Sequence, residues 1–200
     1  MILKTSLLVA AALLAVGAHD PLKDLNIGDA LPAADIAMKD VMGGDKSLSA
    51  LKGESGLLVI FSCNTCPFVI GSEGSTGWEN RYPELGNFCR TNKIGFALVN
   101  SNSTKREAGD GFADMQAHYK EKNYNCHYLL DNDNIVADAF AARTTPHVFL
   151  FDKDLKLVYK GAIDDNVADP KAVTKNYLKD AITAMTSGKS IDPATTKNLG

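Results

Sequence analysis

The chain is poor in cysteine, and its 4 cysteines among 200 residues are too few for a disulfide-stapled scaffold. Only one CxxC is present, so the second ligand pair of a structural zinc site is missing. Basic residues form no cluster and the formal net charge is -3, which argues against nucleic acid as a partner. Repeats and low-complexity linkers are also absent. With 45% hydrophobic and 22% charged residues, the composition predicts one globular domain with a substantial core.

The first residues have the pattern of an export signal. Lys4 provides a positive start, Leu7 to Val16 form an apolar run, and Val16-Gly17-Ala18 is a small-residue cleavage site. We expect a signal peptide at 1–18, a mature domain at 19–200, and a periplasmic or secreted protein without stable membrane association after cleavage. The apolar run is shorter than the roughly 20 residues that span a bilayer, and an uncleaved membrane anchor is the alternative.

The pentapeptide Cys63-Asn64-Thr65-Cys66-Pro67 directly follows an apolar run at 57–61 that predicts a buried strand. A helix after the motif would place Cys63 at its N-terminus, where unpaired backbone N–H groups and the helix dipole favour a thiolate. We therefore expect Cys63 to be the nucleophile. Cys66, three residues later, would lie close enough to resolve a mixed disulfide formed at Cys63. The competing interpretation is an inert structural disulfide.

The remaining pattern alternates strands and helices, which is typical of an α/β protein with a mixed sheet. Further strands are expected at Ile94–Val99 and Tyr128–Leu130, and hairpins from Ala33–Val41 with Lys46–Leu51 and from Val148–Phe151 with Leu157–Lys160. Four helices are expected. The first contains the apolar stripe Trp78, Tyr82, Leu85 and Cys89, the second follows a cap at Asp110, and the third spans Asn134–Ala141. The last runs from Asp169-Pro170 to before Gly188, and its apolar face is Val173, Tyr177, Ala181 and Met185. Three glycines, Gly71, Gly74 and Gly77, should interrupt the helix after the CxxC.

The strand, the CxxC followed by Pro67, and Thr145-Pro146 ahead of a hairpin and a terminal helix resemble the thioredoxin fold. The resemblance covers Ile27 to Met185. It implies a central mixed β-sheet flanked by helices, with an N-terminal β-hairpin extension. In that family the proline corresponding to Pro146 is cis and faces the CxxC. The resemblance therefore implies that Thr145 and Pro146 bind the substrate chain through backbone groups.

Four segments are similar to the peroxiredoxin-like proteins of the redoxin branch, which includes secreted thiol-disulfide oxidoreductases and the alkyl hydroperoxide reductase/thiol-specific antioxidant peroxiredoxins. These segments are Phe61–Phe68, Asn100–Asn102, Arg143–Phe149 and Tyr159–Asp165. The resemblance implies a thiol-disulfide oxidoreductase without an organic cofactor or a metal. Its partners would be disulfide-containing or dithiol proteins and an upstream electron donor. The uncharged pair between the cysteines favours a reducing dithiol over a strongly oxidising one.

Two other functions are open. Peroxiredoxins use an arginine to steady the peroxide, and Arg143 is a candidate. Those enzymes place threonine where Cys63 stands and the peroxidatic cysteine where Cys66 stands, which weakens a peroxidase interpretation. A copper-binding chaperone-like module would combine Cys63 and Cys66 with His147, because two thiolates and an imidazole suit copper(I).

Some residues have no assigned role from the sequence. Cys89 and Cys126 are each expected to be buried thiols or, as an alternative, to pair with each other, which their spacing cannot decide. The strand at 57–61 carries no acid that could exchange protons with Cys66. Glu73 and Glu79 are the nearest acids downstream, and neither is assigned.

Overall fold

The computed structural model describes residues 24–200, so the predicted signal peptide at 1–18 lies outside the described residues. A seven-stranded sheet with the order β2-β1-β5-β4-β3-β6-β7 forms its centre. The strands are β1 (Met38–Asp40), β2 (Asp45–Lys46), β3 (Gly56–Phe61), β4 (Ile94–Asn100), β5 (His127–Leu130), β6 (His147–Asp152) and β7 (Leu157–Gly161). Strands β3, β4 and β5 run parallel, whereas β6, β7, β1 and β2 join in antiparallel pairs. The sheet is mixed, as predicted.

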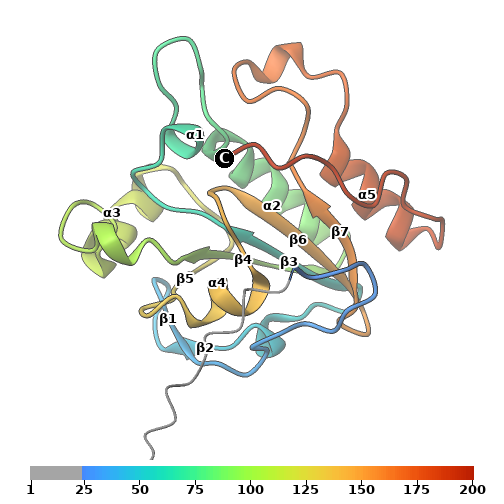
Figure 1. Ribbon diagram of the computed structural model, residues 1–200, viewed down its shortest axis with the longest axis horizontal. Helices are drawn as coiled ribbons and strands as arrows, with labels where there is room; N and C mark the ends of the chain where they lie inside the picture. The colour runs from blue at the N-terminus through green and yellow to red at the C-terminus, as the bar shows by residue number, and fades with distance from the viewer. Residues whose placement is uncertain (1–23) are drawn as a thin grey trace, which may run out of the picture.

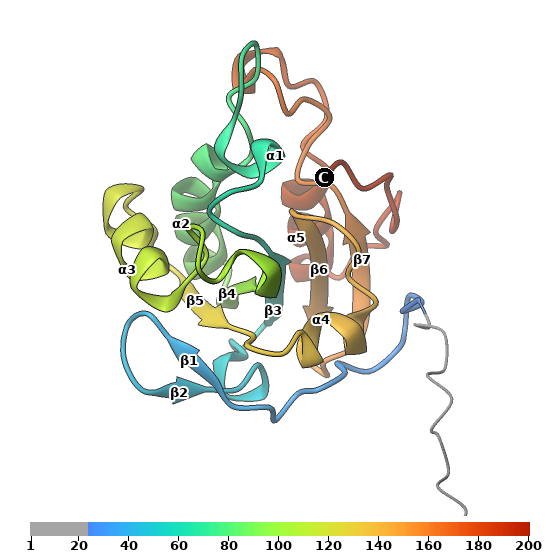
Figure 2. The same ribbon diagram turned by 60° about the vertical axis from the view of Figure 1, so that its left-hand side comes forward.

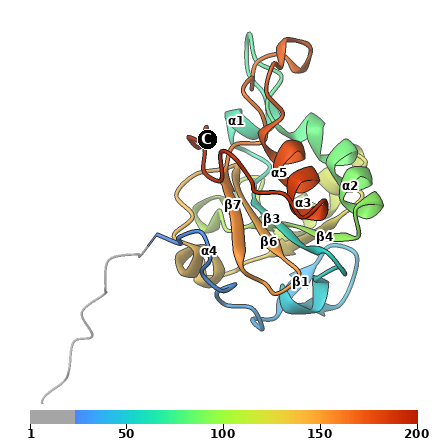
Figure 3. The same cartoon turned by 90° about the vertical axis from the view of Figure 1, so that its right-hand side faces the viewer.

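Helices cover both faces of the sheet (Figures 1 and 2). They are α1 (Pro67–Ile70), α2 (Tyr82–Thr91), α3 (Phe112–Glu121), α4 (Ile135–Phe140) and α5 (Tyr177–Thr186). Helices α2, α3 and α5 pack on the face that carries Leu58 and Ile60. Helix α4 packs through Phe140 on Val59 and Phe61 of the opposite face, and Figure 3 shows it across the sheet from α2 and α5. The predicted central mixed sheet flanked by helices is confirmed.

Strand β3 forms from the apolar run because both of its faces are buried. All six residues of Gly56–Phe61 are buried, and alternate side chains enter the two cores on either side of the sheet. A strand covered on both faces has a continuous apolar sequence rather than an alternating one. Since β4 and β6 flank β3, the strand lies in the interior of the sheet, and the CxxC follows its C-terminal end.

The N-terminal hairpin is confirmed, but it is shorter than predicted. Strands β1 and β2 pair only through Met38 and Lys39, and the turn between them contains Gly43 and Gly44 with φ values of 109° and 72°. Residues 49–51 form a 3-10 turn instead of a strand. The chain turns there to bury Leu48 completely in the core beneath α4.

The last helix starts later than predicted. Residues 170–172 form a single 3-10 turn, and α5 begins at Tyr177. The Asp165 side chain accepts hydrogen bonds from the backbone N–H and the hydroxyl of Thr174, which diverts the chain from a helical path. The fully buried residues of α5 are Leu178, Ala181 and Ile182. Tyr177 and Met185 of the predicted face are partly buried against the same core, and only Val173 lies outside the helix.

Two distant segments cover the outer edge of β7. Leu157 pairs with residues 28–29 through two hydrogen bonds of 2.8 Å, and Lys160 pairs with residues 194–196 through two of 3.1 Å. The second segment brings the C-terminus to the end of the sheet that carries α1 (Figures 1 and 3). Among residues 24–200, no helix has the length and apolar character needed to cross a membrane.

Candidate active site

The CxxC lies at the end of β3, but the helix that follows it begins later than predicted. Helix α1 starts at Pro67, and Cys66 is its N-cap residue with an extended backbone. Proline favours the first helical position because its fixed φ suits the helix and no N–H is lost there. The helix ends before Gly71, whose φ is 92°, so the predicted interruption by glycine is confirmed. The expectation that Cys63 occupies the helix start is wrong, because Cys66 does.

The two thiols differ in exposure and in pKa. Cys63 is 2% exposed, whereas Cys66 is half-buried. Interaction with the Cys63 thiol lowers the pKa of Cys66 against the opposing effect of burial, and the N–H groups of Phe68 and Val69 lower it further. The Cys66 sulfur in turn raises the pKa of Cys63, and burial raises it further. This arrangement favours a thiolate on Cys66 and a proton on Cys63.

Thr145 and Pro146 face the dithiol, and the peptide bond between them is cis. The Thr145 hydroxyl lies 3.3 Å from the Cys63 sulfur, and the Thr145 carbonyl oxygen lies 3.3 Å from the Cys66 sulfur. The loop reaches the thiols because β6 begins directly after it and pairs antiparallel with β3. The structure therefore brings together all four residues that the sequence analysis selected for the site.

A cavity of about 380 Å³ opens onto both thiols. Its walls come from the end of β3, the loop after β4, helix α4 and the segment 142–145. Asn102, Asn134, Asp138 and Arg143 contribute polar side chains to these walls. A small molecule can therefore reach the dithiol from the α4 side of the Thr145 loop.

Asp110 holds the CxxC loop, although the sequence indicated a helix cap. The N-cap of α3 is the next residue. The Asp110 carboxylate is completely buried and accepts hydrogen bonds from the backbone N–H of Asn64 and the hydroxyl of Thr65, both at 2.6 Å. The side-chain amides of Asn100 and Asn102 donate to it at 2.9 and 2.8 Å. A buried carboxylate requires such a set of donors, and this set includes the two residues between the cysteines.

Two more side chains, Arg106 and Tyr128, extend this network into the sheet. Arg106 donates to the side-chain oxygen of Asn100 at 2.8 Å and to the Asp110 carbonyl at 3.0 Å. The Tyr128 hydroxyl accepts from Asn100 at 3.1 Å and donates to the side-chain oxygen of Asn64 at 2.8 Å. Burial raises the pKa of Tyr128, so its hydroxyl keeps the proton that it donates. The CxxC loop is thus fixed from β4, from β5 and from the start of α3.

Arg143 and His147 lie beside the site in different settings. Arg143 lines the cavity, and its exposed guanidinium lies 3.0 Å from the Asp24 carboxylate. The Nδ1 atom of His147 is buried and lacks a partner among residues 24–200, and burial lowers the pKa of His147 to about 4. No three His, Cys, Asp or Glu side chains of residues 24–200 are grouped as a metal site. The geometry of the described residues therefore gives the copper-binding alternative no support.

Glu79 belongs to a buried cluster with α3. Its carboxylate lies 2.6 Å from His118 Nε2, 3.0 Å from the Lys122 ammonium and 3.0 Å from the Tyr124 hydroxyl, which donates to it. These contacts fasten the segment before α2 to α3. Glu73, the other acid considered, is exposed.

The other two cysteines, Cys89 and Cys126, are buried, and both line one small cavity. Burial raises the pKa of Cys89 to about 12 and raises the pKa of Cys126 as well. Both are free thiols in the structure, as are the two cysteines of the CxxC. A raised pKa and a buried sulfur make a thiol unreactive. The predicted burial of both side chains is confirmed.

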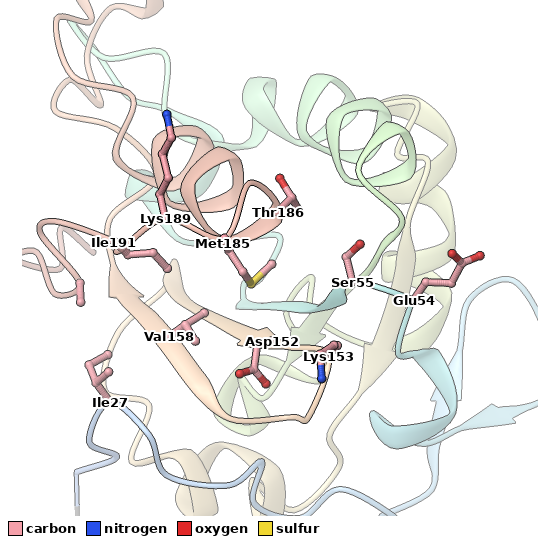
Figure 4. Close-up of a pocket in the computed structure, with 12 residues that line it drawn as sticks. Ile27, Glu54, Ser55, Asp152, Lys153, Val158, Met185, Thr186, Lys189 and Ile191 are labelled. Atoms are coloured by element: carbon pink, nitrogen blue, oxygen red, sulfur yellow. The ribbon is translucent and has the colours of Figure 1, made fainter.

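A second cavity, of about 610 Å³, lies at the other end of the sheet (Figure 4). Ser55 and Asp152 line it beside the start of β3, and Val158, Met185 and Ile191 form an apolar wall. The six residues of β3 separate this cavity from the CxxC by about 17 Å at the usual rise of an extended strand. The cavity at the dithiol is smaller, but Cys63 and Cys66 line it.

A thiol pair at the end of a central strand, facing a cis-proline loop, defines the class of thioredoxin-fold dithiol proteins. Within this class, the Redoxin family model matches residues 26–178, and the chain belongs to the redoxin family. No curated protein matches the chain.

Solved structures show the same fold. An uncharacterized conserved protein from Geobacillus kaustophilus is 27% identical with a TM-score of 0.75, over 86% of this chain and 87% of that one. A hypothetical protein from Sinorhizobium meliloti is 28% identical with a TM-score of 0.77, over 89% and 93% of the two chains. A putative thiol:disulfide interchange protein DsbE from Chlorobium tepidum is 17% identical with a TM-score of 0.60, over 82% and 99%, a likeness in fold alone.

Proposed function

We propose that the protein is an exported thiol-disulfide oxidoreductase that uses Cys63 and Cys66 to reduce or exchange disulfides in partner proteins. The observation that carries this proposal is the placement of both sulfurs 3.3 Å from Thr145, one at its hydroxyl and the other at its carbonyl oxygen. Membership of the redoxin family agrees with it. The export signal predicted at 1–18 supports a periplasmic or secreted location, where disulfide-containing partners occur.

The geometry favours Cys66 as the attacking thiol, which reverses the roles expected from the sequence. Cys66 is the more exposed of the two thiols, and its pKa is lowered. Cys63 is buried with a raised pKa, which suits a thiol that acts only after a mixed disulfide has formed. Thr145 and Pro146 would support the backbone of the partner beside the sulfurs.

The reaction then has two exchange steps. The Cys66 thiolate attacks one sulfur of the partner disulfide, forms a mixed disulfide, and releases the other partner sulfur as a thiolate that takes a proton from solvent. Cys63 loses its proton, with the Thr145 hydroxyl in hydrogen-bond contact, and attacks the Cys66 sulfur. The second partner sulfur leaves as a thiolate and is protonated. The protein dithiol has lost two electrons, the partner has gained them, and an upstream dithiol donor restores the starting state.

Two serine variants test the proposal and the order of the steps. With insulin as the disulfide substrate and a dithiol reductant, Cys66→Ser should lose turnover because no attacking thiol is left. Cys63→Ser should also lose turnover but should hold the partner in a mixed disulfide on Cys66, visible by non-reducing electrophoresis. Cys89→Ala is the matched control and should retain full activity. Full turnover by Cys66→Ser, or trapping only in that variant, would contradict the proposed roles.

One observation also favours a peroxidase as a second candidate function. The thiolate-favouring cysteine, Cys66, stands at the position that peroxiredoxins use, and Arg143 lines the same cavity. Cys66 would attack hydrogen peroxide, form a sulfenic acid and release hydroxide. Cys63 would then displace water from the sulfenic acid and form the Cys63–Cys66 disulfide. Stopped-flow measurement of peroxide consumption by the reduced protein separates this function from slow, incidental oxidation.

A further inference from the structure

The C-terminal segment, residues 194–200, runs along the outer edge of β7 and then turns to the active-site loop. Its first part is anchored by Thr196, whose hydroxyl lies 2.8 Å from the Tyr159 hydroxyl and accepts from the Ala162 N–H at 3.0 Å. A Cβ on Gly161 would lie 2.1 Å from the Thr196 hydroxyl oxygen, so only glycine permits this close approach. The anchor fixes where the following residues go.

The second part of the segment, residues 198–200, contacts the loop that faces the dithiol. The side-chain amide of Asn198 donates to the Thr144 hydroxyl. A Cβ built on Gly200 would lie 2.7 Å from the Thr145 carbonyl oxygen and 2.9 Å from that of Pro146. The Thr145 carbonyl is also the group next to the Cys66 sulfur. The segment therefore lies against the backbone that the proposed function assigns to a partner chain.

Trp78 provides a binding site for the same segment. Its indole N–H donates to the Leu199 carbonyl at 3.1 Å, and the indole itself is completely buried. The Leu199 side chain packs against the core cluster that contains Trp78 and Cys63. The surface thus combines a hydrogen-bond donor for an extended backbone with a socket for one apolar side chain, which is how proteins bind extended peptides.

We propose that the surface covered by residues 198–200 is the polypeptide-binding surface of the active site, and that the segment occupies it until a partner displaces it. The partner is an unfolded or flexible protein segment in extended conformation, with an apolar residue close to its disulfide cysteine. This inference rests on the proposed function. The apolar residue takes the socket of Leu199, and the partner backbone takes the contacts with Trp78 and Thr145.

The segment is suited to be displaced. The Oδ1 atom of Asn198 is buried without a partner among residues 24–200, which costs binding energy that a better-matched chain regains. Because the segment is tethered, it competes at an effective concentration on the order of millimolar. A weakly binding partner therefore does not displace the segment from the surface, whereas a tightly binding partner does.

The cavity on the α4 side remains open while the segment is in place. Its walls include Cys63, Cys66 and Thr145 but none of residues 194–200. Small disulfides and peroxides can therefore reach the thiols without displacing the segment, whereas a polypeptide must compete with it. This difference in access separates the two kinds of substrate in one assay.

The experiment compares wild type with a variant that lacks residues 198–200, on insulin and on hydroxyethyl disulfide. We expect the deletion to raise the kcat/KM for insulin by about threefold to tenfold, because the tethered competitor is gone. The rate with hydroxyethyl disulfide should stay the same. Lys197→Ala, an exposed residue of the same segment, is the control and should behave as wild type.

A second measurement covers the case in which the deletion disturbs folding. The variant Leu199→Ala keeps the segment but empties the socket, and it should show a smaller increase with insulin. A synthetic peptide with the sequence of residues 195–200 should inhibit insulin reduction by either variant and shift the fluorescence of Trp78, the single tryptophan. A peptide with aspartate in place of leucine should do neither.

The outcomes distinguish this inference from the function on which it rests. Unchanged or slower insulin reduction by both variants, with hydroxyethyl disulfide still reduced, would overturn the assignment of the surface. A peptide that fails to inhibit would also overturn it. Failure of the wild type to reduce either disulfide would instead remove the proposed function.

Discussion

The Asp110 carboxylate accepts a hydrogen bond of 2.6 Å from the backbone N–H of Asn64, a residue 46 positions earlier in the chain. A residue in the loop before α3 therefore fixes the backbone between the two cysteines. The same carboxylate accepts from Thr65, so both residues inside the CxxC depend on it. The geometry of the dithiol is set from outside the motif.

Substituting Asp110→Asn should destabilise the protein by about 2–3 kcal/mol, because an amide group would face donors that now bind a buried carboxylate. Urea unfolding at pH 7 measures this loss. The alkylation rate of Cys66 should also change, since the loop that positions its sulfur is released. Asp114→Asn is the control, because that exposed carboxylate only accepts from the N–H of Gly111 at 3.2 Å. Equal stability of the two variants would contradict the role of Asp110.

Alkylation of the reduced protein by iodoacetamide should occur first at Cys66 and should persist at pH 7. The reagent attacks the thiolate, and the pKa of Cys66 is lowered from the ordinary value of 9.0, so its rate should fall only at a pH well below that value. Peptide mass spectrometry assigns each label. Cys89 and Cys126 serve as internal controls and should remain unlabelled until the protein unfolds. Labelling of Cys63 before Cys66 would contradict the assignment.

Glu79→Gln should lower the free energy of unfolding at pH 7 by about 2 kcal/mol. Burial opposes ionisation of Glu79, but the contacts from His118 and Lys122 outweigh it and hold the pKa below the ordinary 4.5. A lowered acid pKa contributes stability above the unfolded value, and that stability disappears as the pH falls through the folded pKa. The difference between wild type and variant should therefore shrink below pH 4.5 in urea titrations.

The matched control for Glu79 is Glu84→Gln. Glu84 pairs with Lys179 at 2.5 Å, but its side chain is 70% exposed, so its loss should cost less than about 1 kcal/mol. If both variants lose the same stability at pH 7, the buried contacts of Glu79 stabilise the protein no more than the exposed pair of Glu84 and Lys179 does.

His147 should make the protein less stable at mildly acidic pH. Burial lowers its pKa from 6.5 to about 4, so the unfolded chain binds a proton in this range before the folded protein does. Stability is therefore lost as the pH falls from 6.5 towards 4, by roughly 3 kcal/mol at about 1.4 kcal/mol per unit. His147→Gln should lack this loss. Thermal unfolding of wild type and of His147→Gln at pH 7 and pH 4.5 measures the difference. If both proteins lose the same stability between these pH values, His147 is not the cause.

The sequence was sufficient for the centre of the fold. An apolar run that is continuous rather than alternating indicates a strand buried on both faces, and β3 is that strand. Thr145-Pro146 could be placed beside the CxxC through the resemblance to the thioredoxin fold, since nothing local to either segment shows that they meet. The ends of helices were less predictable where a side chain binds the backbone. Before α5, for example, the Asp165 carboxylate accepts a hydrogen bond from the backbone N–H of Thr174.

The sequence was not sufficient for the surroundings of the dithiol. Asp110 stands before an apolar stripe and so has the local pattern of a helix cap, while its contacts are with residues far away in sequence. Which cysteine attacks first also depends on where α1 begins. The helix was expected to begin at Cys63, but it begins at Pro67, about one turn later. The contacts of Leu199 with Trp78 join residues 121 positions apart, which no spacing rule can detect.

The covered edge of β7 has a consequence for the behaviour of the protein in concentrated solution. Open strand edges recruit strands of other molecules and begin aggregation. Here one border of the sheet is sealed by residues 28–29 and 194–196, and the other is β2, two exposed charged residues long. Neither border offers a second molecule a long template for intermolecular pairing. Loss of residues 194–200 would leave the backbone groups of Lys160 unpaired at this border, and other molecules could then pair with that part of β7.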